Sequence, residues 1–214
     1  MLISPEELRR SFRLRPHRIL HVGAHTGEEA ELYSLAGWGE RGVTWVEALP
    51  QKVQELSLAL EASGRSRDRI LPVLAWSENV ECLDFYETSN GQSSSALRLR
   101  RHSYWYPEIT VTRTLQMPAY RLDALFSREE GFDLVNLDVQ GAELHVLRGM
   151  GNLLDGVKAI YSEVNTSELY EGCCQLEQLD EFLGALGFER RWISLLEQEW
   201  GDALWIRRGR RSRR

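Results

Sequence analysis

The sequence predicts an α/β fold with a mostly parallel sheet, helices on both of its faces and an antiparallel hairpin at the C-terminal end. Short apolar runs of strand type alternate with segments of helical composition along most of the chain. This alternation is typical of βαβ units, in which helices cover both faces of a parallel sheet. Two apolar runs near the C-terminus follow each other with only a short turn between them, which indicates a hairpin.

The first half of the chain contains the elements that come before an irregular segment. Pro50 opens a helix, because proline in a first turn loses no hydrogen bond. The predicted elements are strand 18–22, helix 28–36, strand 43–46, helix 50–62, strand 69–75 and a short strand 81–86.

The second half returns to the same alternation. Its predicted elements are strand 110–117, helix 121–126, strand 132–139, helix 142–154, strand 159–164, helix 176–186, and strands 188–196 and 203–207 on either side of a turn at 200–202.

Residues 88–107 interrupt the alternation. They contain a polar, serine-rich turn that includes Ser94, then His102 and the aromatic run Tyr104–Tyr106. A long irregular insert in a compact domain is more often a functional loop than an accident. We expect it to form a lid over the acceptor pocket, with His102 pointing inward.

The chain has 214 residues and a formal net charge of −6, which is unevenly distributed. Six arginines lie in residues 207–214, so the remaining body carries −12. We expect one domain over residues 1–206 and a basic, disordered tail over 207–214. An acidic body would repel a phosphate backbone, which argues against nucleic acid as a partner.

Composition also bears on location. No apolar run approaches the ~20 residues that span a bilayer, and the first fifteen residues lack the apolar centre of a signal peptide. The three cysteines have no framework spacing, which is typical of free thiols in a reducing compartment. These features predict a cytoplasmic protein.

A glycine turn follows the first strand, and an acid follows the second. Gly23 and Gly27 would let the backbone approach a ligand, and the following helix offers free N–H groups. Glu47 lies 24 positions after Gly23, where an acid can accept hydrogen bonds from ribose hydroxyls. Together they predict a site for a nucleoside cofactor.

The apolar strand 132–139 carries a third signal. Asn136 and Asp138 share one face of it, because side chains alternate along a strand. A carboxylate over the crevice needs a partner, and a sulfonium or ammonium cation would supply one. Glu143 lies in the next helix's first turn, where the helix dipole stabilises it.

These motifs resemble the FkbM family of methyltransferases. The resemblance runs from about residue 18 to 206 and is carried by Val22-Gly-Ala-His-Thr-Gly27, Val46-Glu-Ala-Leu-Pro50, Arg121-Leu-Asp123 and Asn136-Leu-Asp-Val-Gln-Gly-Ala-Glu-Leu-His-Val-Leu-Arg-Gly149. It implies a class I methyltransferase domain with a Rossmann-like seven-stranded sheet and S-adenosylmethionine as methyl donor. It also implies O-methylation of a sugar or natural product.

The resemblance also implies roles for single residues. Gly23, Ala24, His25 and Gly27 would line the methionine part of the cofactor, and Glu47 would hold its ribose. The adenine would lie beside Ala48, Leu49, Ala75 and Trp76, and Asp138 would face the amino end. The chain departs from the family at His21, where an acidic residue is common two positions before the first glycine.

The acceptor side is less defined by sequence. Methyl transfer to a hydroxyl needs a group that removes a proton, and His25, His102 and Asp138 are the candidates. Ser94, His102, Glu143, Glu163 and Asn165 are candidates for binding the acceptor. A metal held by Asp138, Glu143 and Glu163 stays open as an alternative, although no metal is predicted.

Three other functions compete with this interpretation of the sequence. A nicotinamide oxidoreductase would favour the G-x-G-x-x-G motif, which is absent. A nucleic-acid amino-methyltransferase would favour an Asn/Asp-Pro-Pro-aromatic element where this chain has Asp138-Val-Gln-Gly141. A binding module that keeps the cofactor pocket without turnover stays open, as do the acceptor's identity and the oligomeric state.

Overall fold

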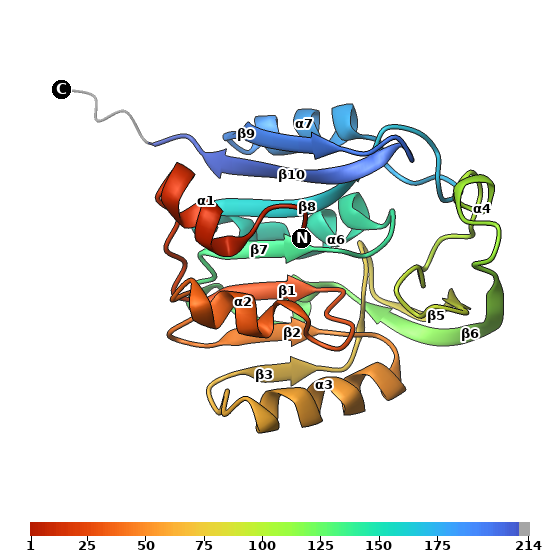
Figure 1. Cartoon of the computed structure of the whole chain (residues 1–214), viewed down its shortest axis with the longest axis horizontal. Coiled ribbons are helices and arrows are strands. Elements are labelled where there is room, and N and C mark those ends of the chain that lie inside the picture. Colours follow the sequence, from red (N-terminus) through yellow and green to blue (C-terminus); the bar gives the residue numbers. More distant parts are fainter. Residues whose placement is uncertain (210–214) are drawn as a thin grey trace.

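A seven-stranded sheet forms the centre of the molecule, as predicted (Figure 1). The computed structural model describes residues 1–209. The strands, in the order in which they lie side by side, are β3 (Arg69–Leu71), β2 (Val43–Val46), β1 (Ile19–Val22), β7 (Leu134–Leu137), β8 (Ala159–Asn165), β10 (Trp200–Arg207) and β9 (Phe188–Leu195). The first five are parallel, and β10 is antiparallel to both β8 and β9.

Helices cover both faces of this sheet. One face carries α1 (Pro5–Phe12), α2 (Glu29–Leu35) and α3 (Pro50–Ala62), and the other carries α5 (Leu122–Leu125), α6 (Glu143–Met150) and α7 (Leu176–Ala185) (Figure 1). Short 3₁₀ turns, η1 (Arg128–Glu130) and η2 (Gly151–Gly156), follow α5 and α6. The sequence analysis missed α1, although Ser4 caps it by accepting a hydrogen bond from the Glu7 N–H at 3.1 Å.

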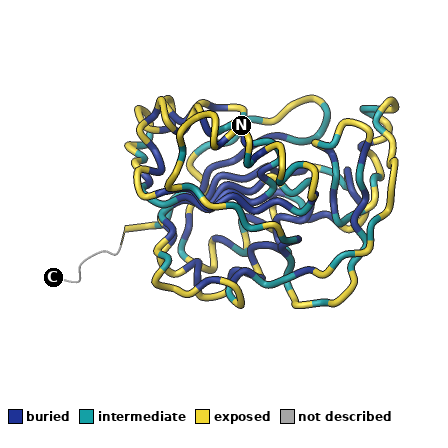
Figure 2. The backbone as a smooth tube through the Cα atoms, turned by 90° about the horizontal axis from the view of Figure 1, so that it is seen from below, coloured by how far each residue is buried: buried dark blue, intermediate teal, exposed yellow. Residues whose placement is uncertain are grey.

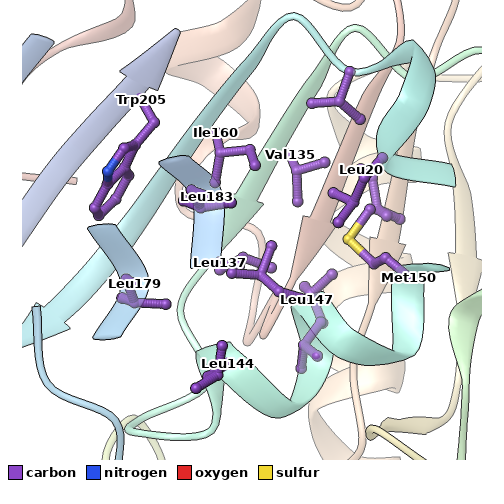
Figure 3. Close-up of a cluster of buried hydrophobic side chains, with 14 of the residues drawn as sticks. Leu20, Val135, Leu137, Leu144, Leu147, Met150, Ile160, Leu179, Leu183 and Trp205 are labelled. Atoms are coloured by element: carbon purple, nitrogen blue, oxygen red, sulfur yellow. The ribbon is translucent and has the colours of Figure 1, made fainter. Parts of the chain in front are cut away.

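The apolar strands are buried because each face packs against helices. Leu20, Val135 and Ile160 of the sheet contact Leu147 of α6 and Leu183 of α7 in one cluster (Figure 3). Figure 2 shows the same central strands buried between exposed outer segments. Hydrophobic burial of this kind holds the strands in place. The polar residues of the site follow the ends of these strands.

The region 69–75 differs from the prediction of one strand. It forms β3 and then β4 (Leu74–Ala75), which belongs to a second sheet of three strands in the order β4-β6-β5. Its other members are β5 (Val80–Thr88) and β6 (Val111–Tyr120). Pro72 lies at the break, where its missing N–H ends the ladder with β2.

The second sheet and the insert lie at the carboxyl end of the parallel strands (Figure 1). Apart from Thr88, the last residue of β5, the only regular element within residues 88–107 is the short helix α4 (His102–Trp105). Two isolated bridges, Tyr86 with Ser95 and Leu99 with Tyr170, tie this insert to its surroundings. The insert is therefore irregular in conformation but attached to its neighbours at these two points.

Two predicted boundaries at the C-terminus are wrong. Residues 200–202 are the start of β10 rather than a turn, and residues 196–199 connect it to β9. Arg207 is the last residue of β10, and its guanidinium donates to the carbonyl oxygens of Val157 and Leu186 at 2.7 and 2.8 Å. The rest of the predicted tail from 210 lies outside the described residues. Every described helix is too short or too polar to cross a lipid bilayer.

Candidate active site

The candidate site lies where the strand order reverses. The chain runs from β1 outward through β2 to β3, and then returns to β7 on the other side of β1. Val22 pairs with Val46 on one side and with Leu137 on the other, so the residues that follow these strands leave the sheet together. In open α/β sheets this switch point is where ligands bind.

The glycine turn after β1 is shaped by its own neighbours. A Cβ on Gly23 would lie 1.8 Å from the carbonyl oxygen of Asp138, and one on Gly27 would lie 2.5 Å from the Leu56 side chain. Both glycines have positive φ values, 82° and 79°, and so does His25 at 45°. These residues bring the β1 and β7 ends into contact and turn the His25 side chain toward the cavities.

Glu47 organises this turn. Its carboxylate accepts hydrogen bonds from the backbone N–H groups of His25 and Leu49, both at 2.8 Å. Burial raises the pKa of Glu47 although these hydrogen bonds act in the opposite direction. A carboxylate has about four lone-pair positions, so two remain for ligand hydroxyls.

Two adjoining cavities open at this end of the sheet, and we call them the narrow limb and the wide limb. The narrow limb has a volume of about 60 Å³ and mostly apolar walls, with Glu47 among the lining residues. Of the predicted cofactor residues, it includes Gly23, His25, Glu47, Ala48, Leu49, Ala75 and Asp138. It also includes Val73, Leu74, Phe85, Val139 and Ala142, which the sequence analysis did not single out.

Trp76 and Gly27 line neither cavity, contrary to prediction. The Trp76 ring lies parallel to the imidazole of His145 on α6, with 3.8 Å between ring centroids. The chain turns after Ala75, so this side chain leaves the cavity and packs against α6. Gly27 shapes the turn without reaching the wall.

The wide limb, of about 380 Å³, meets the narrow limb at four residues that line both. These junction residues are Gly23, His25, Gln92 and Asp138. The wide limb is lined further by Ala24, His102 and Glu163, which are among the candidate site residues, and by Asn90, Ser93 and Tyr106 of the predicted insert. Its other lining residues were not singled out from the sequence: Met1, Leu2, Glu28, Glu29, Ile109, Gln140, Leu169, Tyr170, Trp200 and Asp202.

His25 at the junction is held by a carboxylate. Its Nδ1 lies 2.6 Å from Oε1 of Glu28, and its Nε2 is buried without a hydrogen-bond partner. Burial acts to raise the pKa of Glu28, but the hydrogen bond and charge of His25 and the hydrogen bonds from the Glu28 backbone and Thr26 together outweigh it, and the pKa falls to about 2. A carboxylate that fixes one ring nitrogen leaves the other free to accept a proton.

A polar chain crosses the wide limb. The side-chain amide of Gln140 donates to Asp138 and to Glu163, each at 2.6 Å, and its oxygen accepts from the Tyr170 hydroxyl at 2.6 Å. Asp138 is accessible to the cavity and Glu163 is buried. Enclosure by the protein and the neighbouring carboxylates raise the pKa of both acids.

Three of the residues predicted to bind the acceptor lie elsewhere. Glu143 is fully buried and accepts hydrogen bonds from the N–H groups of Val139 and Gly141, so it stabilises its own turn. Asn165 is also fully buried and lines neither limb. Ser94 lines the narrow limb, whereas its neighbour Ser93 lines the wide one.

The insert contributes to both limbs, and His102 faces the wide one. His102 is 5% exposed, and its Nδ1 has no hydrogen-bond partner. Tyr106 also lines this limb, but Tyr104 is 75% exposed and the Trp105 indole donates to Glu199 at 3.0 Å. Of the three aromatic residues, Tyr106 is therefore part of the cavity wall, Trp105 attaches the insert to Glu199, and Tyr104 is exposed.

The N-terminal segment closes the wide limb from the side. The Met1 ammonium lies 3.4 Å from Oε1 of Glu29, and the Leu2 N–H donates to Asp202 at 2.6 Å. His21 lies beneath, buried in a polar cluster in which the Tyr33 hydroxyl is 3.2 Å from its Nδ1. His21 lines neither limb, and Glu29 brings an acid to the wall instead.

Among residues 1–209, no group of three or more His, Cys, Asp or Glu side chains is arranged to hold a metal ion. Asp138 and Glu163 share the amide of Gln140, and Glu143 faces its own backbone.

The fold and the site define a class: a Rossmann-like α/β protein with two adjoining cavities at the switch point of its sheet. The chain belongs to the FkbM methyltransferase family, because residues 21–190 match the family model described as "Methyltransferase FkbM domain". The family and the Rossmann-like fold predicted from sequence are thus confirmed.

Individual relatives agree with this membership. The chain is 30% identical over 139 residues to the 2-O-methyltransferase NoeI of Sinorhizobium fredii. The matched region covers 57% of each protein. The chain therefore spans little more than half the length of this curated relative.

Two solved structures share the fold. The first is a methyltransferase FkbM from Methylobacillus flagellatus, with TM-score 0.63 and 16% identity, covering 95% of this chain and 48% of that one. The second is a putative tRNA (m1A22) methyltransferase of Streptococcus pneumoniae in complex with S-adenosyl-L-methionine. Its TM-score is 0.53 at 15% identity, covering 94% of this chain and 71% of that one.

Proposed function

We propose that this methyltransferase uses S-adenosylmethionine to methylate a hydroxyl group of a small molecule, such as a sugar or a natural product. The observation that carries the proposal is the junction of the two limbs, where a glycine turn, an imidazole whose Nε2 has no partner among residues 1–209, and a carboxylate line both cavities. Family membership and the O-methyltransferase relative support it.

The residues of the narrow limb fit the nucleoside part of this cofactor. Leu49, Ala75 and Val139 offer apolar surface to a base, and Glu47 has free lone pairs for two ribose hydroxyls. At about 60 Å³ the limb is small for a ligand pocket, so the wall formed by residues 91–96 must move outward on binding.

When bound, the cofactor would supply an electrophilic methyl group, and its sulfur would take the carbon–sulfur electron pair as the acceptor oxygen binds the methyl carbon and loses its proton. Asp138, which lines both limbs, would offer a negative charge to the sulfonium. The wide limb holds the acceptor hydroxyl at the junction and excludes bulk water.

Of the three candidates, we assign proton removal to His25. Its Nε2 is unpartnered at the junction, and Glu28 holds its other nitrogen. Asp138 already accepts a hydrogen bond from Gln140, and His102 lines only the wide limb. His102, whose pKa is lowered by burial, is neutral and accepts a hydrogen bond from the acceptor.

Calorimetry tests the cofactor half of this proposal. We expect S-adenosylmethionine or S-adenosylhomocysteine to bind with a Kd of micromolar order and NAD not to bind. Tight NAD binding without any response to the methyl donor would overturn the proposal.

A further inference from the structure

The wide limb is an acidic cavity with few compensating cations. Five carboxylates line it, and none of its lining residues within 1–209 is lysine or arginine. The acids are Glu28, Glu29, Asp138, Glu163 and Asp202. The Met1 ammonium also lines this limb but is paired with Glu29, so an anionic ligand, such as a phosphorylated or carboxylated sugar, would meet repulsion from the other carboxylates.

Three of these acids already have partners in the protein. Glu28 binds His25 at 2.6 Å, and Glu29 lies 3.4 Å from the Met1 ammonium. Asp202 accepts hydrogen bonds from the Leu2 N–H and the Tyr161 hydroxyl. Their negative charges are therefore hydrogen-bonded or balanced at the edges of the limb.

Among residues 1–209, the carboxylates of Asp138 and Glu163 have only a neutral hydrogen-bond partner. A single amide nitrogen of Gln140 donates to both carboxylates. Repulsion between neighbouring carboxylates and loss of solvation both disfavour the doubly charged state, and a bound cation removes this penalty. Asp138 lines both limbs, so under the proposed function it would face the sulfonium, whereas Glu163 lines the wide limb alone.

Other residues that line this limb suit a cation or its attached ring. Tyr106, Tyr170 and Trp200 are aromatic, and aromatic faces attract cations. His102 is 5% exposed, lines this limb and keeps Nδ1 without a partner among residues 1–209. A buried polar atom without a partner points to a ligand that supplies one.

We infer that the acceptor carries an ammonium group beside the hydroxyl that is methylated, and that Glu163 binds this ammonium. The acceptor class is an amino sugar or another amino alcohol rather than a neutral polyol or an anionic sugar. This inference rests on the proposed function, because it takes the junction to be the methyl-transfer point.

Three glycosides of similar size test it on protein loaded with S-adenosylhomocysteine. They are the methyl glycosides of glucosamine, N-acetylglucosamine and glucuronic acid, which are cationic, neutral and anionic near pH 7. NMR titration should give a Kd for the glucosaminide at least tenfold lower than for the N-acetyl compound, and no binding of the glucuronide. Equal affinities, a preference for the glucuronide, or no glucosaminide binding would overturn the inference.

Two matched variants assign the effect to Glu163. In Glu163→Gln the preference for the ammonium form should fall to threefold or less. Glu181→Gln removes an acid from an exposed position on α7 and should keep the full preference. An unchanged preference in a folded Glu163→Gln protein would refute the assignment, and the wild-type titrations stand alone if that variant does not fold.

The same samples separate this inference from the proposed function. Calorimetry with S-adenosylhomocysteine comes first, and a failure to bind removes the proposed function. The glycoside titrations on free protein then still report the charge preference of the limb. Cofactor binding without a preference among glycosides contradicts the inference alone.

Discussion

The narrow and wide limbs differ in which parts of the chain supply the polar groups that line them. In the narrow limb, one side chain, Glu47, is fixed by backbone N–H groups, and the remaining walls are mostly apolar. In the wide limb, side chains from the loop after β7, from β8 and β10, from the insert and from the N-terminal segment contribute polar groups. The proposed cofactor side thus depends on a few short motifs, and the proposed acceptor side on residues that are distant in sequence.

The insert belongs to both limbs and shows how they are coupled. Ser94 and Ala96 line the narrow limb, whereas Ser93 and His102 line the wide one. Ser95 donates a hydrogen bond to the Gln140 carbonyl at 2.8 Å, which ties the insert to the loop after β7. Movement of the insert on cofactor binding would therefore also reshape the acceptor wall.

Replacing the junction histidine should give the largest effect. His25→Asn keeps a residue that tolerates positive φ but removes the base, and general-base catalysis contributes roughly 10²–10⁴-fold to rate. We expect kcat to fall by at least 10²-fold, with cofactor Kd changed less than threefold, measured as S-adenosylhomocysteine release and by calorimetry.

A second histidine provides the control for this test. His17 makes a similar pair with Glu40, 2.7 Å from Nδ1 to Oε1, far from both limbs, and His17→Asn should leave kcat unchanged. Near-normal kcat in His25→Asn, together with a large loss in Asp138→Asn, would move the base to Asp138. His102→Ala should raise the acceptor KM without changing cofactor affinity.

Glu47→Ala should distinguish the roles of the two limbs through its effect on cofactor affinity. Hydrogen bonds to a charged acceptor are worth roughly 1.5–3 kcal/mol each, and two ribose hydroxyls would lose theirs. Cofactor Kd should rise at least tenfold by calorimetry. Glu163→Gln in the wide limb should change it less than threefold, and equal losses in both variants would mean that the limbs do not divide cofactor from acceptor.

The buried acid behind the wide limb should couple stability to pH. Burial raises the pKa of Glu143 to about 7, whereas an unfolded glutamate titrates near 4.3. The folded state therefore binds more protons between about pH 4 and 7, so this residue's contribution to stability declines as pH rises through that window.

Glu143→Gln removes this titration and isolates its contribution. The melting temperature of the variant minus that of the wild type should become more positive by several degrees from pH 5 to pH 8. Differential scanning calorimetry at constant ionic strength measures it. A difference that is flat or declines with pH would show that the folded protein holds Glu143 charged without penalty.

The sequence predicted the sheet well because its strands and helices follow simple periodic rules. Strand 43–46 and helix 50–62 match β2 and α3 residue for residue. The strand 69–75 was wrong because an apolar run does not show that Pro72 transfers the chain to another sheet. The motif residues Gly23, Glu47 and Asp138 line the cavities because the strand register fixes them.

Side-chain direction beyond the strand ends was much harder to predict. Glu143 and Glu163 look equivalent in sequence, but Glu143 turns back to its own backbone while Glu163 reaches the cavity. Trp76 likewise points away from the cavity, and its ring packs against the imidazole of His145. Gln140 lies only two residues after Asp138, so its place in the motif could have indicated a site residue. Met1 and Asp202 reach the site through tertiary packing alone.

The smallest and most specific test uses two adjacent serines, one for each limb. Ser93 lines the wide limb and Ser94 the narrow one, and both hydroxyls also hold the turn, since Ser94 Oγ accepts from the Thr88 N–H at 3.0 Å. A net hydrogen bond contributes about 0.5–1.5 kcal/mol, which corresponds to a change in affinity of roughly two- to twelvefold.

Ser94→Ala should therefore raise the cofactor Kd a few-fold and leave the acceptor KM unchanged, and Ser93→Ala should do the reverse. Because the substitutions are identical and adjacent, loosening of the turn would affect both measurements in both variants. Separate effects would show that the insert faces the two limbs independently, and matching effects would show that it acts on them as one rigid wall.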